Sequence, residues 1–220
     1  MIKAVLFDLD NTLIDFISMK RSASRAAAKA MVKAGLNAKP KELSKELFDF
    51  YLDYGIESDD AFTKFLEKKV GVAEPKILAA GLNAYLKEKY LHLKPYPGVL
   101  ETLAKLQKKG LKIGLVSDGL RLKAWMRLNE AGLDKYFDTV ITYEDTGEKK
   151  PSKKPFLNAC KALNVKPNEC LMVGDWPEKD IEGAKALGMT TVLAGYGGRS
   201  TKQVKADYKI KMINELEDIV

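Results

Sequence analysis

The sequence contains only two cysteines, Cys160 and Cys170, and a single histidine. Two thiols cannot build a disulfide framework or a four-ligand zinc site, so we expect both to be reduced and buried. No run of 18 apolar residues occurs, and the apolar start of the chain is too short for a signal peptide. These absences exclude a membrane-spanning helix and favour a protein of the reducing cytoplasm.

The sequence also lacks a long block of charges of one sign, because acidic residues are interspersed among the basic ones. Lysine and arginine number 37 against 30 acidic residues, which gives a net charge of +7. The densest basic cluster, at 149–154, has no aromatic residues among its lysines that could stack on bases. We therefore expect a solvated charged surface and no nucleic-acid partner.

Short apolar runs alternate with helical patterns over most of the 220 residues. The runs lie at 2–7, 111–116, 139–142, 170–173 and 190–194. The helical patterns lie at 98–109, 122–131, 154–163 and 179–187. Runs that are apolar throughout suit strands covered on both faces, and their alternation with helices is typical of right-handed crossover units. The sequence predicts an α/β fold with an open, doubly wound parallel sheet.

Residues 16–92 interrupt this alternation, because they contain no strand-like run. Their apolar residues recur at helical spacing in stretches at 19–34, 41–54, 59–70 and 74–91. We expect 16–92 to form an all-helical domain, inserted into an α/β core domain made of 1–15 and 93–220. Pro95 and Pro97 stiffen the return to the core domain.

Acidic and hydroxyl side chains follow three of the predicted strands. Asp8 and Asp10 come after the first strand, Ser117 follows the second, and Asp175 follows the fourth, with Asp180 five residues later. A single aspartate at such a place usually caps a turn or helix. Three strand ends together would instead bring several carboxylates to one edge of the sheet, where ligands bind in this kind of fold. Their mutual repulsion calls for a cation, and Mg²⁺ prefers such oxygen ligands.

Four segments together resemble the motifs of the haloacid dehalogenase (HAD) superfamily of phosphotransferases. The first is Asp8-Leu9-Asp10-Asn11-Thr12-Leu13, which is similar to the Asp-x-Asp-x-Thr motif of that family. The others are Ser117, Lys150-Pro151 with Phe156 six residues after the lysine, and Gly174-Asp175 with Asp180. The four segments follow one another in the expected order, and each lies in the expected strand or loop. The helical insertion lies where a type-one cap would be.

The resemblance implies roles for three catalytic residues. Asp8 would be the nucleophile that attacks phosphorus and forms an aspartyl-phosphate. Asp10 would protonate the leaving oxygen and later take a proton from the attacking water. Lys150 would supply a fixed cation beside the phosphoryl group. Lys150 is preferred over Lys149 because it directly precedes Pro151, although the Lys-Pro-x-Pro pattern common in relatives is incomplete here.

The resemblance also implies a substrate-binding set and a metal site. The residues assigned to the substrate phosphate are Thr12, Ser117, Asp118 and Gly119, the last two through their backbone amides. The Mg²⁺ ligands it implies are the side chains of Asp8 and Asp175 and the backbone carbonyl of Asp10, with Asp180 supporting them from behind.

The function expected from these motifs is Mg²⁺-dependent hydrolysis of a small phosphorylated metabolite. A phosphomutase or a phosphonate-cleaving enzyme of the same fold remains an alternative. A 2-haloacid dehalogenase is disfavoured because those relatives lack an aspartate at the position of Asp10. A non-catalytic binding module is disfavoured because Asp8 and Asp10 are both present. The partner is then the metabolite itself, and the protein is expected to be a monomer or homodimer.

Overall fold

Two compact units make up the chain in the computed structural model, which describes residues 1–56, 58–198 and 204–220. The first unit consists of Met1–Asp15 and Lys94–Val220, and the second of Phe16–Leu93. Each unit has a hydrophobic core of its own. The second unit is therefore an insertion into the chain of the first.

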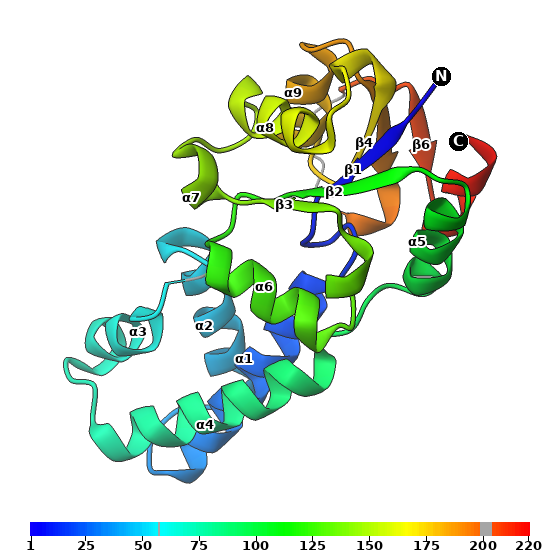
Figure 1. The fold of residues 1–220 in the computed structure, drawn as a ribbon. Helices are drawn as coiled ribbons and strands as arrows, with labels where there is room; N and C mark the ends of the chain where they lie inside the picture. The colour runs from blue at the N-terminus through cyan, green and yellow to red at the C-terminus, as the bar shows by residue number, and fades with distance from the viewer. Residues whose placement is uncertain (57, 199–203) are drawn as a thin grey trace. The chain divides into compact units, whose positions relative to one another are not determined.

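The first unit is built on a six-stranded sheet with the strand order β3-β2-β1-β4-β5-β6 (Figure 1). The strands are β1 (Ala4–Phe7), β2 (Lys112–Val116), β3 (Thr139–Ile141), β4 (Cys170–Gly174), β5 (Thr190–Ala194) and β6 (Tyr208–Ile210). All neighbouring strands pair in parallel. This confirms the predicted doubly wound α/β class. Every residue of β1 and β4 is buried, which is why these strands appear as unbroken apolar runs.

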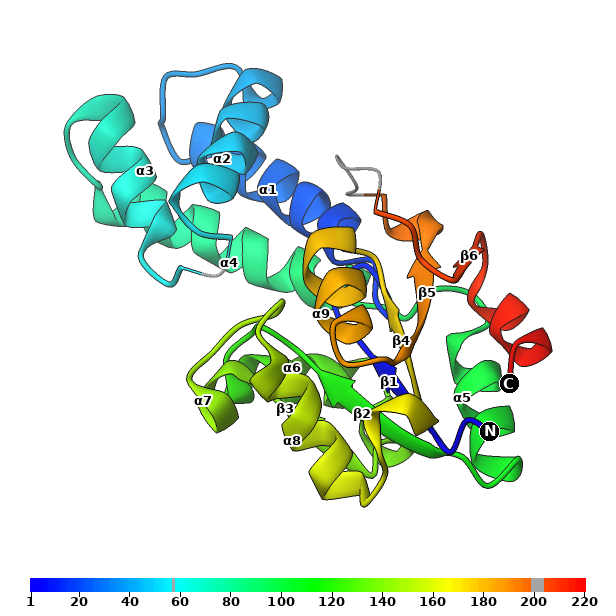
Figure 2. The same cartoon turned by 90° about the horizontal axis from the view of Figure 1, so that it is seen from above.

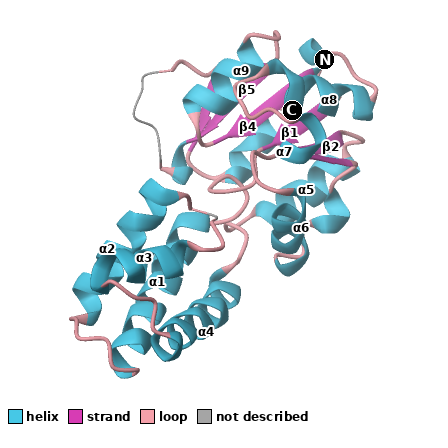
Figure 3. Cartoon of the chain, turned by 90° about the vertical axis from the view of Figure 1, so that its left-hand side faces the viewer, coloured by secondary structure: helices cyan, strands magenta, loops and turns pink. Residues whose placement is uncertain are grey.

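Helices cover both faces of this sheet. They are α5 (Val99–Lys108), α6 (Arg121–Glu130), α7 (Tyr143–Thr146), α8 (Lys153–Leu163) and α9 (Glu182–Lys185). Because crossovers between parallel strands are right-handed, α5 and α6 lie on one face and α8 and α9 on the other (Figure 3). On the α8 side, Phe156 is fully buried against Gly183. Cys160 and Cys170 are buried in the same core, as expected, with their Sγ atoms 3.5 Å apart.

The strand order reverses between β1 and β4, which lie side by side at the centre of the sheet (Figure 2). Phe7 is in register with Val173 and with Leu115. The carboxyl ends of β1, β2 and β4 therefore lie next to one another, and this is the place where open α/β sheets bind ligands.

The second unit contains four of the described helices: α1 (Phe16–Lys33), α2 (Pro40–Tyr54), α3 (Ala61–Val70) and α4 (Pro75–His92). Alanines on the buried face of α1 let α4 approach closely, and a Cβ on Gly81 would lie 2.4 Å from Met31 Cε. The core of this unit also holds an aromatic group of Tyr51, Phe62 and Tyr85. Helical spacing in the sequence thus predicts the inserted helices well.

Among the elements of the first unit that differ from the prediction are a helix after β4 and the last strand. The helix predicted at 179–187 is a π-helical turn, Pro177–Ile181, followed by the short α9. The strand β6 was not predicted, because only Ile210 of its three residues is buried and the segment therefore lacks an apolar run. Among the described residues, no helix has the length and apolar character needed to cross a membrane.

Candidate active site

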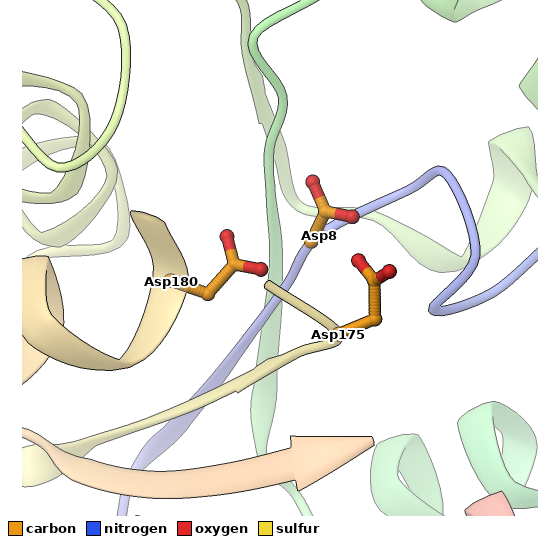
Figure 4. Close-up of side chains that lie close together, drawn as sticks. All are labelled: Asp8, Asp175 and Asp180. Atoms are coloured by element: carbon orange, nitrogen blue, oxygen red, sulfur yellow. The ribbon is translucent and has the colours of Figure 1, made fainter. Parts of the chain in front are cut away.

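Three aspartates meet at the carboxyl ends of the two central strands. Asp8 follows β1 and Asp175 follows β4, and the Asp8 amide donates to the Val173 carbonyl at 2.9 Å. Asp180 returns to the same place from the π-helical turn, where its carboxylate accepts a hydrogen bond from the Trp176 amide at 3.0 Å. Carboxylate oxygens of Asp8, Asp175 and Asp180 lie within 4.8 Å of one another. Figure 4 shows these three side chains close together.

A missing side chain makes room for this cluster. Gly174 ends β4, and a Cβ built on it would lie 2.3 Å from Asp180 Cγ. A second glycine, Gly197, packs against Asp175 from the loop after β5, where a Cβ would lie 2.4 Å from Asp175 Cβ. Both backbones therefore approach the acidic side chains more closely than any other residue would permit.

Lys150 is the cation at the centre of the cluster. Its Nζ lies 2.6 Å from Asp8 Oδ1 and 2.7 Å from Asp180 Oδ1, and donates to the Val116 carbonyl at 2.8 Å. Its backbone amide donates to Asp118 Oδ1 at 2.9 Å, which fixes the loop that carries the lysine. Burial opposes the charged form, but the carboxylates of Asp180 and Asp8 outweigh it and raise the pKa of Lys150. The lysine therefore remains an ammonium throughout the physiological range.

One ammonium does not balance three buried carboxylates. Burial, together with the charges of Asp8 and Asp180, raises the pKa of Asp175 to about 8. Burial also raises the pKa of Asp180, and Asp8 adds to the effect, while Lys150 opposes it. Without a further cation, the cluster thus binds protons that isolated aspartates would have released near neutral pH.

The loop after β1 turns back on itself and presents Asp10 and Thr12. Asn11 makes this turn in the left-handed conformation with φ of 63°. Thr12 Oγ1 donates to Asp8 Oδ2 at 3.3 Å, and its carbonyl accepts from Tyr196 Oη at 2.8 Å. The Asp10 carboxylate accepts a hydrogen bond from Arg127 of α6 at 2.8 Å.

The segment after β2 lies on the other side of β1. Ser117 is buried, and its Oγ accepts from the Gly119 amide at 3.1 Å. The Asp118 carboxylate holds two neighbouring segments, the Lys150 amide through Oδ1 and the ammonium of Lys179 through Oδ2, the latter at 2.9 Å. The Asp118 side chain thus connects the loops of the site to one another, and its carboxylate is already engaged in doing so.

Comparison with known proteins agrees with this geometry. The family model of haloacid dehalogenase-like hydrolases matches residues 2–188, which include all four motif segments and the strands β1 to β4. The chain belongs to this family.

Individual relatives of this HAD-like hydrolase cover it almost completely. The glyceraldehyde 3-phosphate phosphatase of Methanopyrus kandleri is 38% identical over 100% of this chain and 97% of its own length. The crystal structure of a HAD phosphatase from Thermococcus onnurineus is 30% identical, with a TM-score of 0.69 over 99% of this chain and 97% of that one. The magnesium-bound HAD-hydrolase YfnB of Bacillus subtilis has a TM-score of 0.72 over 99% of this chain and 98% of that one; at 20% identity it shows the shared fold alone.

The acidic residues of this HAD-like hydrolase fit a hard divalent cation. Asp175 Oδ2 is buried and has no hydrogen-bond partner within residues 1–56, 58–198 and 204–220. Asp8 and Asp175 offer oxygen donors from adjacent strands, as Mg²⁺ requires. The excess of buried negative charge around Lys150 is the electrostatic complement of such an ion.

The structure also brings residues to the site that the sequence did not indicate. Arg127 pairs with Asp10 across 117 positions of sequence, and nothing in the local pattern of α6 points to that partner. Tyr196 and Gly197 come from a loop whose residues carry no catalytic motif. Arg127 does occupy a position that helical spacing assigns to the buried face of α6, beside Ala124 and Leu128, and this was the one available signal.

Proposed function

We propose that this chain is a Mg²⁺-dependent phosphatase that hydrolyses a small phosphorylated metabolite through a phosphorylated Asp8. The observation that supports this most directly is the setting of Asp8, whose carboxylate lies 2.6 Å from Lys150 Nζ and beside Asp175 and Asp180. The naming of the Methanopyrus relative makes glyceraldehyde 3-phosphate the first candidate substrate.

The first half of the reaction transfers the phosphoryl group to the protein. An Asp8 oxygen forms a bond to phosphorus while the bond from phosphorus to the substrate oxygen breaks. The Asp10 carboxyl group gives its proton to that departing oxygen, so that an alcohol leaves in place of an alkoxide. Ser117 donates its hydroxyl hydrogen to a phosphoryl oxygen, and the Lys150 ammonium faces the negative charge.

The second half releases phosphate. Asp10, now a carboxylate, takes a proton from a water molecule as the water oxygen bonds to phosphorus and the Asp8–phosphorus bond breaks. Asp8 is then a carboxylate again and Asp10 is again protonated. Mg²⁺ bound by Asp8, Asp175 and the Asp10 carbonyl would supply charge neutralisation between the anionic nucleophile and the anionic phosphate.

Phosphate release tests the reaction and its metal requirement together. The purified chain is incubated with glyceraldehyde 3-phosphate, phosphoglycolate, pyrophosphate and p-nitrophenyl phosphate, with Mg²⁺ and with EDTA. We expect inorganic phosphate to appear with Mg²⁺ and to be abolished by EDTA. Full rates after rigorous removal of the metal would contradict the proposal.

The substitution Asp8→Asn tests the nucleophile. We expect the rate to fall by about 10³-fold or more, because the amide cannot form the phosphoryl intermediate. Asp134→Asn is the matched control, since Asp134 lies in the turn before β3 and therefore at the amino end of that strand, whereas the site lies at the carboxyl ends of the strands. Activity of Asp8→Asn equal to that of Asp134→Asn would refute the assignment of Asp8.

The alternatives differ in their products. A phosphomutase would return the phosphoryl group to the substrate, so an isomerised sugar phosphate would form without free phosphate. A phosphonate-cleaving enzyme would use a lysine Schiff base, which borohydride traps in the presence of substrate. A haloacid dehalogenase would release halide without metal. A binding module would turn over none of these compounds.

A further inference from the structure

Arg127 makes an ion pair with Asp10 that the proposed mechanism does not yet use. Its Nη1 lies 2.8 Å from Asp10 Oδ2. Only 4% of the Arg127 side chain is exposed, whereas 26% of the Asp10 side chain remains accessible. The arginine is thus the buried and constrained partner, and the aspartate is the partner that solvent and small molecules can reach.

Burying Arg127 on the inward face of its helix costs free energy, because the charged side chain loses its hydration. Helix α6 turns Ala124, Arg127 and Leu128 toward the interior, and a guanidinium in such a stripe must shed its water. An apolar side chain there would fill the same space without that cost. A buried arginine that ends on an accessible carboxylate therefore suggests a role at that carboxylate.

We propose that Arg127 is a positioning residue for Asp10, holding its carboxyl group in the orientation from which it delivers a proton to the leaving oxygen. This inference rests on the proposed function, specifically on the role of Asp10 as the acid. Asp10 belongs to a turning loop, and the contact to the rigid, planar guanidinium restricts how its carboxyl group can rotate.

The proton balance leaves Arg127 unchanged. As the substrate's phosphorus–oxygen bond breaks, the proton of the Asp10 carboxyl group moves to the departing oxygen, and Asp10 becomes a carboxylate that faces a permanent cation. In the second half-reaction, the proton from water returns to Asp10. Arg127 therefore acts through Asp10 in both steps and does not itself exchange a proton.

The test compares two leaving groups. An alkyl phosphate needs the acid because it expels a strongly basic alkoxide, whereas p-nitrophenyl phosphate expels a phenolate that departs without a proton. The measured quantity is kcat/KM for the best alkyl phosphate of the panel above, divided by kcat/KM for p-nitrophenyl phosphate. Because kcat/KM covers the steps up to the first irreversible one, this ratio reports proton delivery in the first half-reaction.

The variants are Arg127→Lys, Arg127→Met and Asp10→Asn. We expect Asp10→Asn to lower the ratio by about 10²-fold or more. Arg127→Met should lower the ratio by roughly 10- to 100-fold, because the acid is no longer held in place. The ratio of Arg127→Lys should lie between those of Arg127→Met and wild type. In the double variant Asp10→Asn with Arg127→Met, the ratio should equal that of Asp10→Asn alone, because no acid remains to be positioned.

Arg121→Met is the matched control. Arg121 begins the same helix and pairs with Asp145 through Nη2, so the variant makes the same chemical change without touching Asp10. Its ratio should equal that of wild type. A merely structural role of Arg127 would reduce the amount of active protein, which lowers both kcat/KM values equally and leaves their ratio unchanged.

Two further outcomes would overturn the inference, and they are distinguishable. If the Arg127 variants keep the ratio within about threefold of wild type while Asp10→Asn lowers it, Arg127 does not position the acid, and the proposed function stands. If Asp10→Asn itself leaves the ratio unchanged, the acid role of Asp10 is wrong, and the inference about Arg127 fails with it.

Discussion

Magnesium binding to this protein should depend steeply on pH, because the ion must displace protons from the acidic cluster. In the metal-free protein, the pKa of Asp175 is raised to about 8 by burial and by the charges of Asp8 and Asp180. Below pH 8 the carboxyl group is therefore protonated, and binding of Mg²⁺ releases that proton. Each pH unit below 8 weakens apparent affinity about tenfold, or roughly 1.4 kcal/mol.

The sign for stability follows from the same shift. The Asp175 carboxyl group is ionised in the unfolded chain above pH of about 4. Between that pH and about 8, the folded metal-free protein holds a proton that the unfolded chain lacks. This group's contribution is full at low pH, falls by about 1.4 kcal/mol per unit as the pH rises, and levels off above pH 8. Mg²⁺ opposes this loss, so its stabilising effect grows with pH.

Isothermal titration calorimetry with Mg²⁺ at pH 6, 7 and 8 measures this linkage directly. From pH 6 to pH 8 we expect the apparent Kd to fall by about 50-fold, because a carboxyl group with a pKa of about 8 is almost fully protonated at pH 6 and half ionised at pH 8. The rise in Tm that Mg²⁺ produces should be larger at pH 8 than at pH 6. In Asp180→Asn the steep region should move to lower pH, because one of the charges that raise the pKa of Asp175 is gone. A Kd that differs by less than threefold between pH 6 and pH 8 would refute the reasoning.

Three substitutions test how the site and the inserted unit are packed. In EDTA, Lys150→Met should lower the free energy of unfolding in urea by about 3–5 kcal/mol, because Asp8 and Asp180 lose their buried cation. The control Lys149→Met, at the exposed neighbouring lysine, should change the free energy of unfolding by less than about 0.5 kcal/mol. Gly174→Ala should weaken Mg²⁺ binding by about tenfold or more, since the new Cβ would lie 2.3 Å from Asp180 Cγ; unchanged affinity would show that the carboxylate can move freely. Gly81→Ala should cost about 1 kcal/mol, because crowding of Met31 exceeds the helix propensity gained; an increase in stability would contradict the close packing of α1 and α4.

The sequence revealed those features that arise from local patterns. Strands β1 and β4 are buried on both faces, so their apolar runs are unbroken and easily recognised. The acidic residues directly follow those strands, and the rule that parallel strands end at one edge was enough to predict that Asp8 and Asp175 would meet. The helices α1 to α3 were visible because each buries a stripe at helical spacing, and α4 because Ile77, Leu78 and Leu82 pack partly buried against the same core.

The features that the sequence did not reveal depend on distant partners. Arg127 could be assigned to the inward face of α6 but not to Asp10, because its partner is 117 residues away. In the π-helical turn Pro177–Ile181, Asp180 pairs with Lys150, a partner 30 positions away that the local helix pattern does not indicate, and accepts from the nearby Trp176 amide. Strand β6 lies at the sheet edge, where one buried residue suffices for pairing.

The strand order explains why the acidic cluster stands where it does, despite its cost. The chain lays down β1, β2 and β3 in one direction and then places β4 on the other side of β1, so the loops after β1 and β4 diverge and leave a gap between them. Asp8 and Asp175 directly follow the two strands that border this place, and Lys150 pairs there with both Asp8 and Asp180. Packing alone would favour uncharged side chains at so buried a place. Protons relieve the repulsion between these carboxylates at low pH, and a bound cation relieves it where the carboxylates are ionised. The same repulsion that weakens the metal-free fold at high pH therefore provides the driving force for binding the ion.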